Sequence, residues 1–352
     1  MKNKLPGFCA LVLLSLLASA CASSSQRGWN AYHSGDNELA LAEWTALADD
    51  GDPEAQFLVG TMHEEGRGVV RDSAVAALWY LAAAAQGHAP SQVNLGRLYA
   101  TGDGVQRDSE EAAMWYESAA EDGQTGAQYN YGMMLLLGED VEADQPRATS
   151  LLTRAARKDH SGAQYLLGLA LSGQFGVERE PKAAVTWMRR SAKSGNESAQ
   201  HILGTWYLHG SELPQSDVLA EKWLTLSADQ GLAEAQYLVG WMYHKGQGVE
   251  QDHETAAQWM GLAAEQGLAI AQTNLGLMHL RGQGVQQDKR AALRLLTAAA
   301  DQGFELAEFN LGLLYTKVKG PYDDDPRGKS YLRRAAEGGL DSAEERIAFN
   351  MH

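Results

Sequence analysis

The feature that most constrains this chain is a period of 36 residues, which runs along it without a net insertion or deletion. Successive copies begin with a small residue at Ala55, Ser91, Ala127, Ala163, Ala199, Ala235, Ala271 and Ala307, and Ala343 opens a ninth, partial copy. We call this residue position 0 of its copy. Position 5 is a glycine in all eight copies: Gly60, Gly96, Gly132, Gly168, Gly204, Gly240, Gly276 and Gly312. Such regularity predicts a repeat protein in which each copy is one structural unit.

Within a copy, two apolar patterns predict two helices. Positions 0, 4 and 8 share one face of a first helix, and positions 21, 24, 25 and 28 follow the i, i+3, i+4, i+7 spacing of a second. In the sixth copy these residues are Ala235, Val239 and Tyr243, then Ala256, Trp259, Met260 and Ala263. Each copy is therefore expected to be a helical hairpin.

Residues typical of helix ends support these boundaries. An aspartate stands where the second helix should start, at Asp72, Asp108, Asp144, Asp252 and Asp288, which suits an N-cap. A glycine follows its end, at Gly87, Gly123, Gly195, Gly231, Gly267, Gly303 and Gly339, which suits a left-handed C-cap residue. Before the first copy, Gly51 closes one helix while Asp52 caps the next and Pro53 opens it.

The expected fold class is all-α, an α/α solenoid of about eight hairpins with half-repeats at each end. A chain of 352 residues commonly forms two or three globular domains, but no composition break divides residues 37–345. One quasi-linear domain over 37–352 fits better, because its core is renewed between each pair of neighbours.

The columns A-Q-x-x-L-G-x-x-Y, G-x-G-V-x-x-D, A-x-x-W and A-A-x-x-G resemble the Sel-one-like repeat (SLR) family, relatives of the tetratricopeptide repeat. The resemblance covers about residues 55–352, and Asn37–Gly51 adds half a copy before it. It implies a right-handed α-solenoid that binds protein or peptide partners and performs no reaction. The loops GSELPQS from Gly210 and KVKGPYDDD from Lys317 depart from the pattern.

The glycine pair of these loops could be mistaken for a nucleotide-binding fingerprint. That fingerprint needs G-x-G-x-x-G between a strand and a helix. Here Gly282 and Gly284 are followed by Gln287, after a helical pattern. The loop recurs from copy to copy, so we interpret it as part of the repeat, and we expect no cofactor.

The N-terminus predicts export. Residues 1–20 carry Lys2 and Lys4, then an apolar run and small residues, as in a secretory signal peptide. The ending Ala18-Ser19-Ala20-Cys21 resembles a bacterial lipobox, which implies lipidation of Cys21 and an outer-membrane lipoprotein facing the periplasm. The same residues also satisfy an ordinary cleavage site, which leaves a periplasmic or secreted soluble protein as the alternative. Residues 21–36 are then expected to be a flexible tether.

Charge and cysteine content narrow the partners. The formal net charge is -16 and becomes -18 without Lys2 and Lys4, so nucleic acid and anionic lipid surfaces are poor candidates. Nine acids and no base lie between Asp36 and Glu65, so this end carries a negative field that either aids solubility or receives a basic partner. Cys9 lies in the signal, so Cys21 is the only cysteine expected in the mature chain and no internal disulfide can form. Membrane contact is expected through the N-terminal lipid only.

The sequence lacks the local signatures of common enzymes. It contains no G-x-S-x-G, no H-E-x-x-H and no paired C-x-x-C. His209, His244 and His279 are 35 apart on a 36-residue period, so each is rotated by about 100° from equivalence and no metal site is expected. The run Asp323–Asp325 lacks the alternating spacing of a calcium loop. We expect no catalytic residue; a cell-wall or β-lactam hydrolase is the enzyme alternative.

Tryptophans divide into two groups. Trp79, Trp115, Trp187, Trp223 and Trp259 share position 24 and are expected in the core. Trp241 stands at position 6, where other copies carry residues of different character, so packing does not fix that position. In relatives of the resembled fold the first helices line the concave face, which makes positions 2, 6 and 9 the candidates for a binding groove. In the sixth copy these are Tyr237, Trp241 and His244.

Asparagine recurs at position 3 as Asn94, Asn130, Asn274 and Asn310. Because its amide offers a donor and an acceptor, it can bond the backbone of a bound peptide, as in peptide-clamping tetratricopeptide domains. The alternative is a bond within the scaffold to a neighbouring turn. The functional expectation is a non-enzymatic envelope scaffold that holds protein or peptide partners, and the alternative is a secreted, host-facing binding protein.

Overall fold

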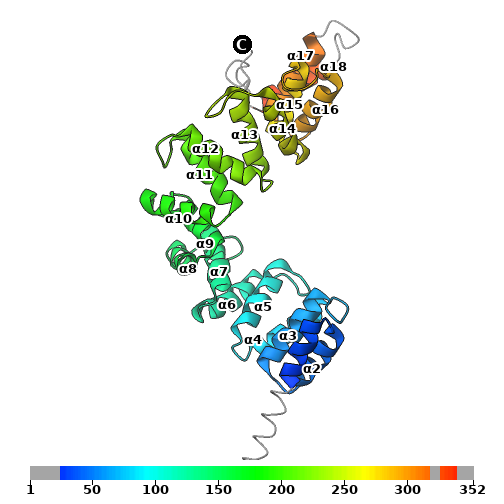
Figure 1. Ribbon diagram of the computed structural model, residues 1–352, viewed down its shortest axis with the longest axis vertical. Helices are drawn as coiled ribbons and strands as arrows, with labels where there is room; N and C mark the ends of the chain where they lie inside the picture. Colours follow the sequence, from blue (N-terminus) through cyan, green and yellow to red (C-terminus); the bar gives the residue numbers. More distant parts are fainter. Residues whose placement is uncertain (1–23, 318–325, 339–352) are drawn as a thin grey trace, which may run out of the picture. The chain divides into compact units, whose positions relative to one another are not determined.

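The computed structural model describes residues 24–317 and 326–338, and the regular elements in these ranges are helices with no strand among them. The chain divides into two compact units, Met1–Val177 and Glu178–His352 (Figure 1). After a helix over residues 24–34, the first unit contains α2 (Asn37–Asp49), α3 (Pro53–Glu65), α4 (Ser73–Ala84), α5 (Ala89–Thr101), α6 (Ser109–Glu121), α7 (Thr125–Leu137), α8 (Gln145–Arg157) and α9 (Ser161–Leu171). The second unit contains α10 (Pro181–Lys193), α11 (Glu197–His209), α12 (Asp217–Ala228), α13 (Ala233–Lys245), α14 (His253–Glu265), α15 (Ala269–Arg281), α16 (Lys289–Ala300), α17 (Glu305–Lys317) and α18 (Pro326–Glu337).

Within each unit, every helix packs against the next one along the chain. Each copy that lies inside one unit therefore forms a hairpin, such as α13 with α14, and neighbouring hairpins stack (Figure 1). This confirms the α/α solenoid class expected from the period. Among the described helices, none has the length and apolar character needed to cross a membrane.

The predicted helix ends are confirmed. Asp72, Asp108, Asp252 and Asp288 each accept hydrogen bonds from two backbone amides of the second helix, and Asp144 accepts one from Arg147 at 2.9 Å. The glycines after the second helix have φ between 77° and 102° at Gly87, Gly123, Gly195, Gly231, Gly267 and Gly303; Gly339 lies outside the described residues. Polar side chains thus satisfy the helix starts, and left-handed glycines end the helices.

The fixed glycine at position 5 lets the two helices of a hairpin touch. A Cβ atom on Gly240 would lie 2.9 Å from Met260 Cγ and 3.0 Å from the Ala256 carbonyl oxygen. The same conflict arises between Gly60 and Tyr80, Gly96 and Tyr116, Gly204 and Leu224, and Gly276 and Leu296. The glycine is therefore required by the side chain at position 25 of the same copy.

Position 25, not position 24, is the centre of each hairpin core. Tyr80, Met188, Leu224 and Met260 are fully buried there, whereas the tryptophans at position 24 are only half-buried. The prediction that Trp79, Trp115, Trp187, Trp223 and Trp259 form the core is wrong in this respect, although Trp79 and Trp115 do pack against core clusters. One residue along a helix turns the side chain by about 100°, which carries position 24 to the core edge.

The second glycine of the loop fixes contact with the preceding copy. A Cβ on Gly248 would meet Asp217, the first residue of α12, at 2.8 Å. In the fifth copy Glu212 replaces this glycine and forms an ion pair with Arg179 at 2.6 Å. In the third copy Asp140 replaces it, with φ 62°, and pairs with Arg107. The loop is thus structural, as interpreted; the KVKGPYDDD loop extends into residues that the structure does not describe.

In the first seven copies, a glutamine at position 1 joins the copy to the helix before it. Its Nε2 donates to a backbone carbonyl near the end of the preceding second helix, at 3.0 to 3.3 Å. These donors are Gln56, Gln92, Gln128, Gln164, Gln200, Gln236 and Gln272. The helix ends are buried in the stack, so this bond satisfies a carbonyl that water does not reach.

The region expected to be a flexible tether is partly helical. Residues 24–34 form a helix that packs on α2: the Trp29 and Trp44 rings lie 5.1 Å apart, and Arg27 pairs with Glu43 at 2.8 Å. Trp44 is 1% exposed, and Gly28 lies against its indole ring. The half-copy Asn37–Gly51 is therefore completed into a hairpin by residues that the sequence analysis assigned to the tether.

Candidate partner-binding sites

The sixth copy places its three predicted groove residues along α13, but they differ in accessibility. Tyr237 and Trp241 are half-buried, and His244 is only 7% exposed. Trp241 packs against a core cluster that includes Ala256 and Met260. Position 6 is also buried in other copies, at Leu169 and Leu277. The expectation that packing does not constrain position 6 is therefore wrong. Trp241 packs one side of its ring against the core and leaves only the other side accessible.

Asn274 is used within the scaffold. Its side chain is fully buried, and its Nδ2 donates to the Tyr237 hydroxyl at 3.2 Å. Burial raises the pKa of Tyr237, so the phenol stays protonated at neutral pH. The structural alternative thus describes Asn274 better than a bond to a peptide backbone, since a buried amide cannot reach a ligand on the surface.

His244 faces His253, with ring centroids 4.8 Å apart. Burial, together with the neighbouring His253, Lys245 and Arg281 side chains, lowers the pKa of His244 to about 4. At neutral pH this imidazole is therefore uncharged. It belongs to the interior of the sixth copy and does not line an open groove.

The first unit uses its asparagines in the same way. Asn94 lies beside the hydroxyl of Tyr80, and Asn130 lies beside that of Tyr116, so each pair brings two neighbouring copies together. Burial raises the pKa of both tyrosines, that of Tyr116 to about 12. In the second unit, Asn310 donates to the Leu306 carbonyl at 2.7 Å. Asn274 and Asn310 therefore bond within the scaffold, and Asn94 and Asn130 lie next to a tyrosine at position 25 of the preceding copy.

A charged network covers the first helices of the first unit. Glu64 pairs with Arg97, and it accepts a hydrogen bond from the Tyr80 hydroxyl at 2.8 Å. Arg97 stands at position 6, the position of Trp241 in the sixth copy. The same scaffold position thus presents a cation in one copy and an indole in another.

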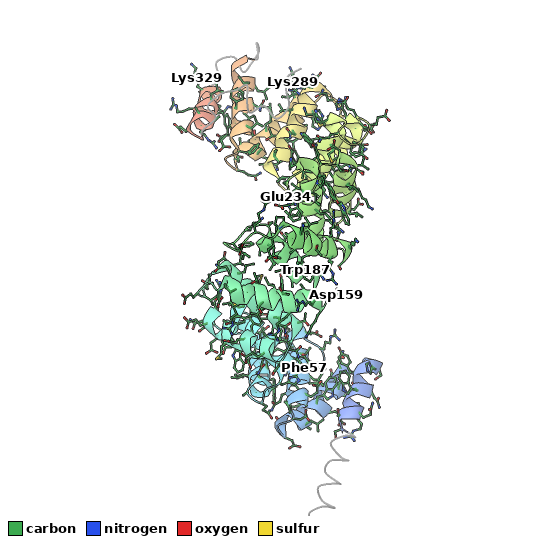
Figure 2. All side chains as sticks on the ribbon, turned by 90° about the vertical axis from the view of Figure 1, so that its left-hand side faces the viewer. Phe57, Asp159, Trp187, Glu234, Lys289 and Lys329 are labelled. Carbon is green, nitrogen blue, oxygen red and sulfur yellow. The ribbon has the colours of Figure 1, made fainter. Side chains whose placement is uncertain are left out.

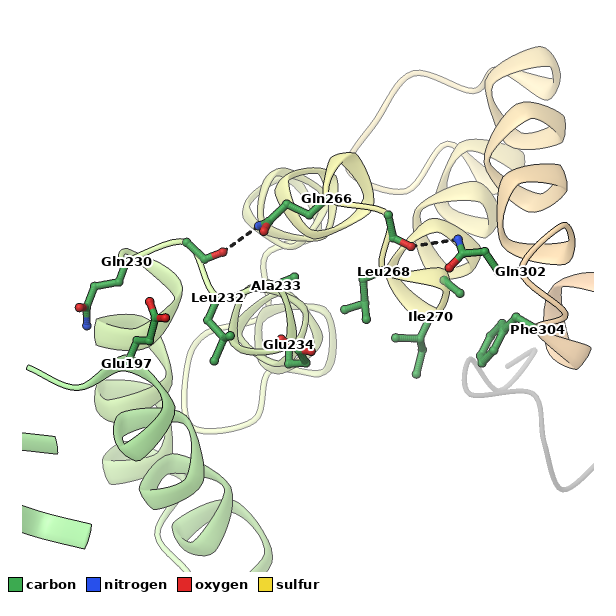
Figure 3. Close-up of a pocket in the computed structure, with 13 residues that line it drawn as sticks. Glu197, Gln230, Leu232, Ala233, Glu234, Gln266, Leu268, Ile270, Gln302 and Phe304 are labelled. Atoms are coloured by element: carbon green, nitrogen blue, oxygen red, sulfur yellow. Dashed lines mark hydrogen bonds between the residues drawn. The ribbon is translucent and has the colours of Figure 1, made fainter. Parts of the chain in front are cut away.

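The sequence analysis missed a groove formed by the turns between copies of the second unit. It has a volume of about 800 Å³ and is lined by residues 230–234 and 266–270, together with Gln302, Phe304 and Glu197 (Figure 3). We call it the turn groove. Leu232, Leu268 and Phe304 occupy the same position of successive copies, directly before the first helix. That apolar column was the signal in the sequence.

Two acids border this apolar row. Glu197 and Glu234 are exposed and line the groove, and Glu234 stands on the surface of the second unit (Figure 2). In the close-up, Leu232, Leu268, Ile270 and Phe304 project to the same side of the turns (Figure 3). The site is therefore an apolar surface bordered by negative charge.

Nothing in the described ranges points to a metal centre. No group of three or more His, Cys, Asp or Glu side chains is arranged to hold an ion there. Cys21, the predicted lipidation site, and Asp323–Asp325 lie outside the described residues.

Comparisons with known proteins identify the repeat. The family model described as Sel1 repeat matches residues 53–88, 89–124, 125–160, 161–196, 197–232, 233–268, 269–304 and 306–340. These matches preserve the period of 36 residues and cover most of the chain. A comparison with curated proteins gives no match.

Two solved structures are similar over most of their length. One is c5321, a protective antigen of uropathogenic Escherichia coli with an SLR fold, at 29% identity and a TM-score of 0.80, covering 94% of this chain and 72% of that one. The other is a Sel1 repeat protein from Oxalobacter formigenes, at 30% identity and a TM-score of 0.69, covering 89% of this chain and 95% of that one.

Proposed function

The chain belongs to the Sel1 repeat family, and from this we propose that it is a non-enzymatic scaffold of the bacterial cell envelope that binds protein or peptide partners. Proteins built from Sel1 repeats generally mediate protein–protein interactions, and their solenoid is typically non-catalytic. The observation that carries the proposal is that some positions of the repeat are constant from copy to copy while others vary. Glycine at position 5 is constant, whereas position 6 changes from Arg97 to Trp241.

This division supports binding because a scaffold needs constant packing and variable surface. The constant residues make contacts within the stack, as Gly240 does with Met260. Variable residues that are only half-buried still present one side for recognition, and aromatic and arginine side chains dominate protein interfaces energetically. Trp241 and Arg97 have the chemistry of such contact residues.

Crosslinking in intact cells tests this function. A photoreactive amino acid replaces Trp241, Arg97 or Ile270, one at a time, and the captured protein is identified by mass spectrometry. Gln258, an exposed residue on α14, is the control position. The proposal requires the same partner from at least one test position and not from Gln258; capture of no protein from any test position contradicts it.

The envelope address rests on the resemblance of residues 18–21 to a lipobox. Along the sequence, only Ala22 and Ser23 separate Cys21 from residues 24–34, which are helical and pack on α2. A lipid on Cys21 would therefore hold the first unit close to the membrane surface. Cys21→Ser is expected to abolish incorporation of labelled fatty acid and to release the protein from the membrane fraction, because anchoring depends on buried acyl chains. Retention of the variant in the membrane fraction at high salt would contradict the lipoprotein assignment.

A host-facing binding protein is the second candidate, favoured by one observation. The similar structure from uropathogenic Escherichia coli is that of a protective antigen. Antibody labelling of intact cells distinguishes a surface-displayed protein from a periplasmic one. Labelling only after the outer membrane is permeabilised would support the periplasmic scaffold.

A further inference from the structure

The turn groove is built from apolar residues at a position that is polar in the other copies. There the residue before the first helix caps it in three copies: Asp52 accepts a bond from the Ala55 amide at 2.8 Å, His160 one from the Ala163 amide at 3.1 Å, and Asn196 one from the Ala199 amide at 2.8 Å. His88 and Gln124 make no such bond. Leu232 and Leu268 make no such bond, and Phe304 is likewise apolar. A polar N-cap is worth about 1 kcal/mol, so two consecutive copies forgo stability where they line a groove.

The core does not bury these apolar residues completely. Leu268 packs against the cluster around Met260 and Leu275, and Phe304 packs against the cluster around Leu296 and Leu311, but both remain half-buried. Ile270 adds a third half-buried apolar side chain beside them. The row therefore offers apolar area that a ligand can cover.

The turns that carry this row are held together by paired glutamines. Gln266 Nε2 donates to the Gly231 carbonyl at 2.8 Å and to Gln236 Oε1 at 2.8 Å. Gln302 makes the same two bonds one copy later, to the Gly267 carbonyl at 2.9 Å and to Gln272 Oε1 at 3.0 Å. Figure 3 shows the bonds to the two glycine carbonyls. Fixed turns reduce the entropy lost when a ligand binds, which is the benefit of preorganisation.

The charged side chains within the three turns are acidic, and Arg334 of α18 reaches the start of the third turn, where it donates to the Ala300 carbonyl at 3.0 Å. Glu197 and Glu234 line it, and Asp229, Glu265, Asp301 and Glu305 lie in the same three turns. No lysine or arginine stands within residues 229–234, 265–270 or 301–305. A ligand with a positive charge is attracted to this surface and an acidic one is repelled.

We propose that the turn groove binds an extended segment of a partner protein that combines apolar side chains with at least one lysine or arginine. This deepens the proposed scaffold function and rests on it. The apolar side chains cover Leu268, Ile270 and Phe304, and the basic side chain lies at Glu234 or Glu197. An extended segment fits because the groove runs along three successive turns. A second copy of this chain fits less well, because its net charge of -16 opposes approach to an acidic surface.

A random 12-residue peptide library displayed on phage, selected on the purified full chain, tests the proposal. We expect enriched sequences that carry apolar residues together with lysine or arginine. One enriched peptide is then synthesised with a fluorophore, and its Kd is measured by fluorescence polarisation beside a version in which glutamate replaces each basic residue. The glutamate version should bind at least tenfold more weakly.

Two variants locate the binding, and one serves as a matched control. Leu268→Asn introduces the residue that caps the equivalent helix at Asn196, so it removes the apolar contact without harming the fold. It should weaken binding about tenfold, the loss for one buried leucine, with no fall in Tm. Glu234→Gln should weaken binding about twofold in low salt and less in high salt, as for an exposed ion pair. Gln124→Asn changes the same pre-helix position in the first unit and should leave Kd unchanged.

Several outcomes would overturn the proposal. These are an enriched set without basic residues, equal binding of the glutamate version, and a Kd that Leu268→Asn leaves unchanged. Self-association lost in Leu268→Asn, seen by sedimentation, would make a second copy the occupant. Peptide affinity that rises tenfold on removal of residues 339–352 would make the chain's own end the occupant. Crosslinking at Trp241 or Arg97 without any at Ile270 would refute the groove while the scaffold function stands.

Discussion

The turns between copies differ between the two units, although they join the same pair of helices. In the first unit the residue before the first helix is polar in every copy: Asp52, His88, Gln124 and His160. In the second unit it is Asn196, then Leu232, Leu268 and Phe304. Asp52 and His160 bond the amides of their helices, but Leu232 and Leu268 cannot. His88 and Gln124 make no cap bond either, whereas Asn196 does. The difference between the units is therefore that this position is polar throughout the first unit and apolar in three copies of the second.

The glutamines differ in a parallel way. In the second unit Gln200, Gln236 and Gln272 receive a second glutamine at position 31, namely Gln230, Gln266 and Gln302. In the first unit only Gln56 does so, from Gln86 at 2.9 Å. Gln92 and Gln128 keep a buried Oε1 with no hydrogen-bond partner in the described chain, because Asp122 and Lys158 occupy position 31. The paired glutamines thus recur in every copy that lines the groove, whereas among Gln56, Gln92 and Gln128 of the first unit only Gln56 has such a partner.

The comparison presumes that both units share one kind of core, and core truncation tests this with the largest expected effect. Leu152 in the first unit and Met260 in the second are both fully buried at position 25. Leu152→Ala and Met260→Ala should each lower the free energy of unfolding by about 2–5 kcal/mol. Trp259→Ala, at the half-buried neighbouring position, should cost less than Met260→Ala. Urea denaturation followed by circular dichroism measures all three; a larger loss for Trp259→Ala would restore position 24 as the core.

The fixed glycine should matter equally in the two units, with a smaller effect. Gly96→Ala brings a methyl group 2.9 Å from the Tyr116 ring, and Gly240→Ala brings one 2.9 Å from Met260. Each should cost about 1–3 kcal/mol, as overpacked sites do. Gly261, a helical glycine of α14 with open space around it, is the matched control. Gly261→Ala should stabilise by up to about 1 kcal/mol, and a similar gain in Gly240→Ala would refute the close-contact explanation.

Exchanging the residues that precede the first helices tests the difference between the two units directly. Asn196→Leu should destabilise by about 1 kcal/mol, and Leu268→Asn should stabilise by a similar amount less the apolar contact that it loses. Thermal melts of the two variants and of the double variant measure both effects. If Asn196→Leu leaves Tm unchanged, the caps of the first helices contribute nothing, and the leucines of the second unit need no functional explanation.

The period predicts which residues are equivalent, but it does not say which neighbour each one meets. It correctly predicted the hairpins, the aspartate caps and the glycine turns, because these depend on local backbone geometry. The period predicted Trp259 at the centre of the core, but the structure has Met260 there. It predicted Asn274 in a binding groove, but the structure shows a buried Asn274 bonded to Tyr237. A difference of one residue rotates a side chain by about 100°, which a column count cannot resolve.

Two features were missed because they break the period. The helix over residues 24–34 has its close-contact glycine at Gly28, out of register with position 5, so counting from Ala55 did not find it. Trp29 and Tyr32, three apart on one helical face, were the available signal. The turn groove was missed because Leu232, Leu268 and Phe304 stand where the pattern expects a cap. Neither feature could be seen by asking only what the copies have in common.

The smallest expected effect concerns the unpartnered glutamine of the first unit. Asp122→Gln places at position 31 the residue that the second unit uses, so its Nε2 can donate to Gln92 Oε1, as Gln86 does to Gln56. A hydrogen bond to a buried acceptor that lacks a partner should raise the free energy of unfolding by about 0.5–1.5 kcal/mol. Asp122 also places a negative charge at the C-terminal end of α6, where the helix dipole disfavours it, so removing the charge alone gives a few tenths of this. Asp122→Asn is the matched control, because it removes the charge with a side chain one methylene shorter. If the two variants have the same denaturation midpoint, charge accounts for the whole gain. The paired glutamines beneath the turn groove would then add nothing to its rigidity, and the contrast between the two sets of turns would reduce to their apolar residues.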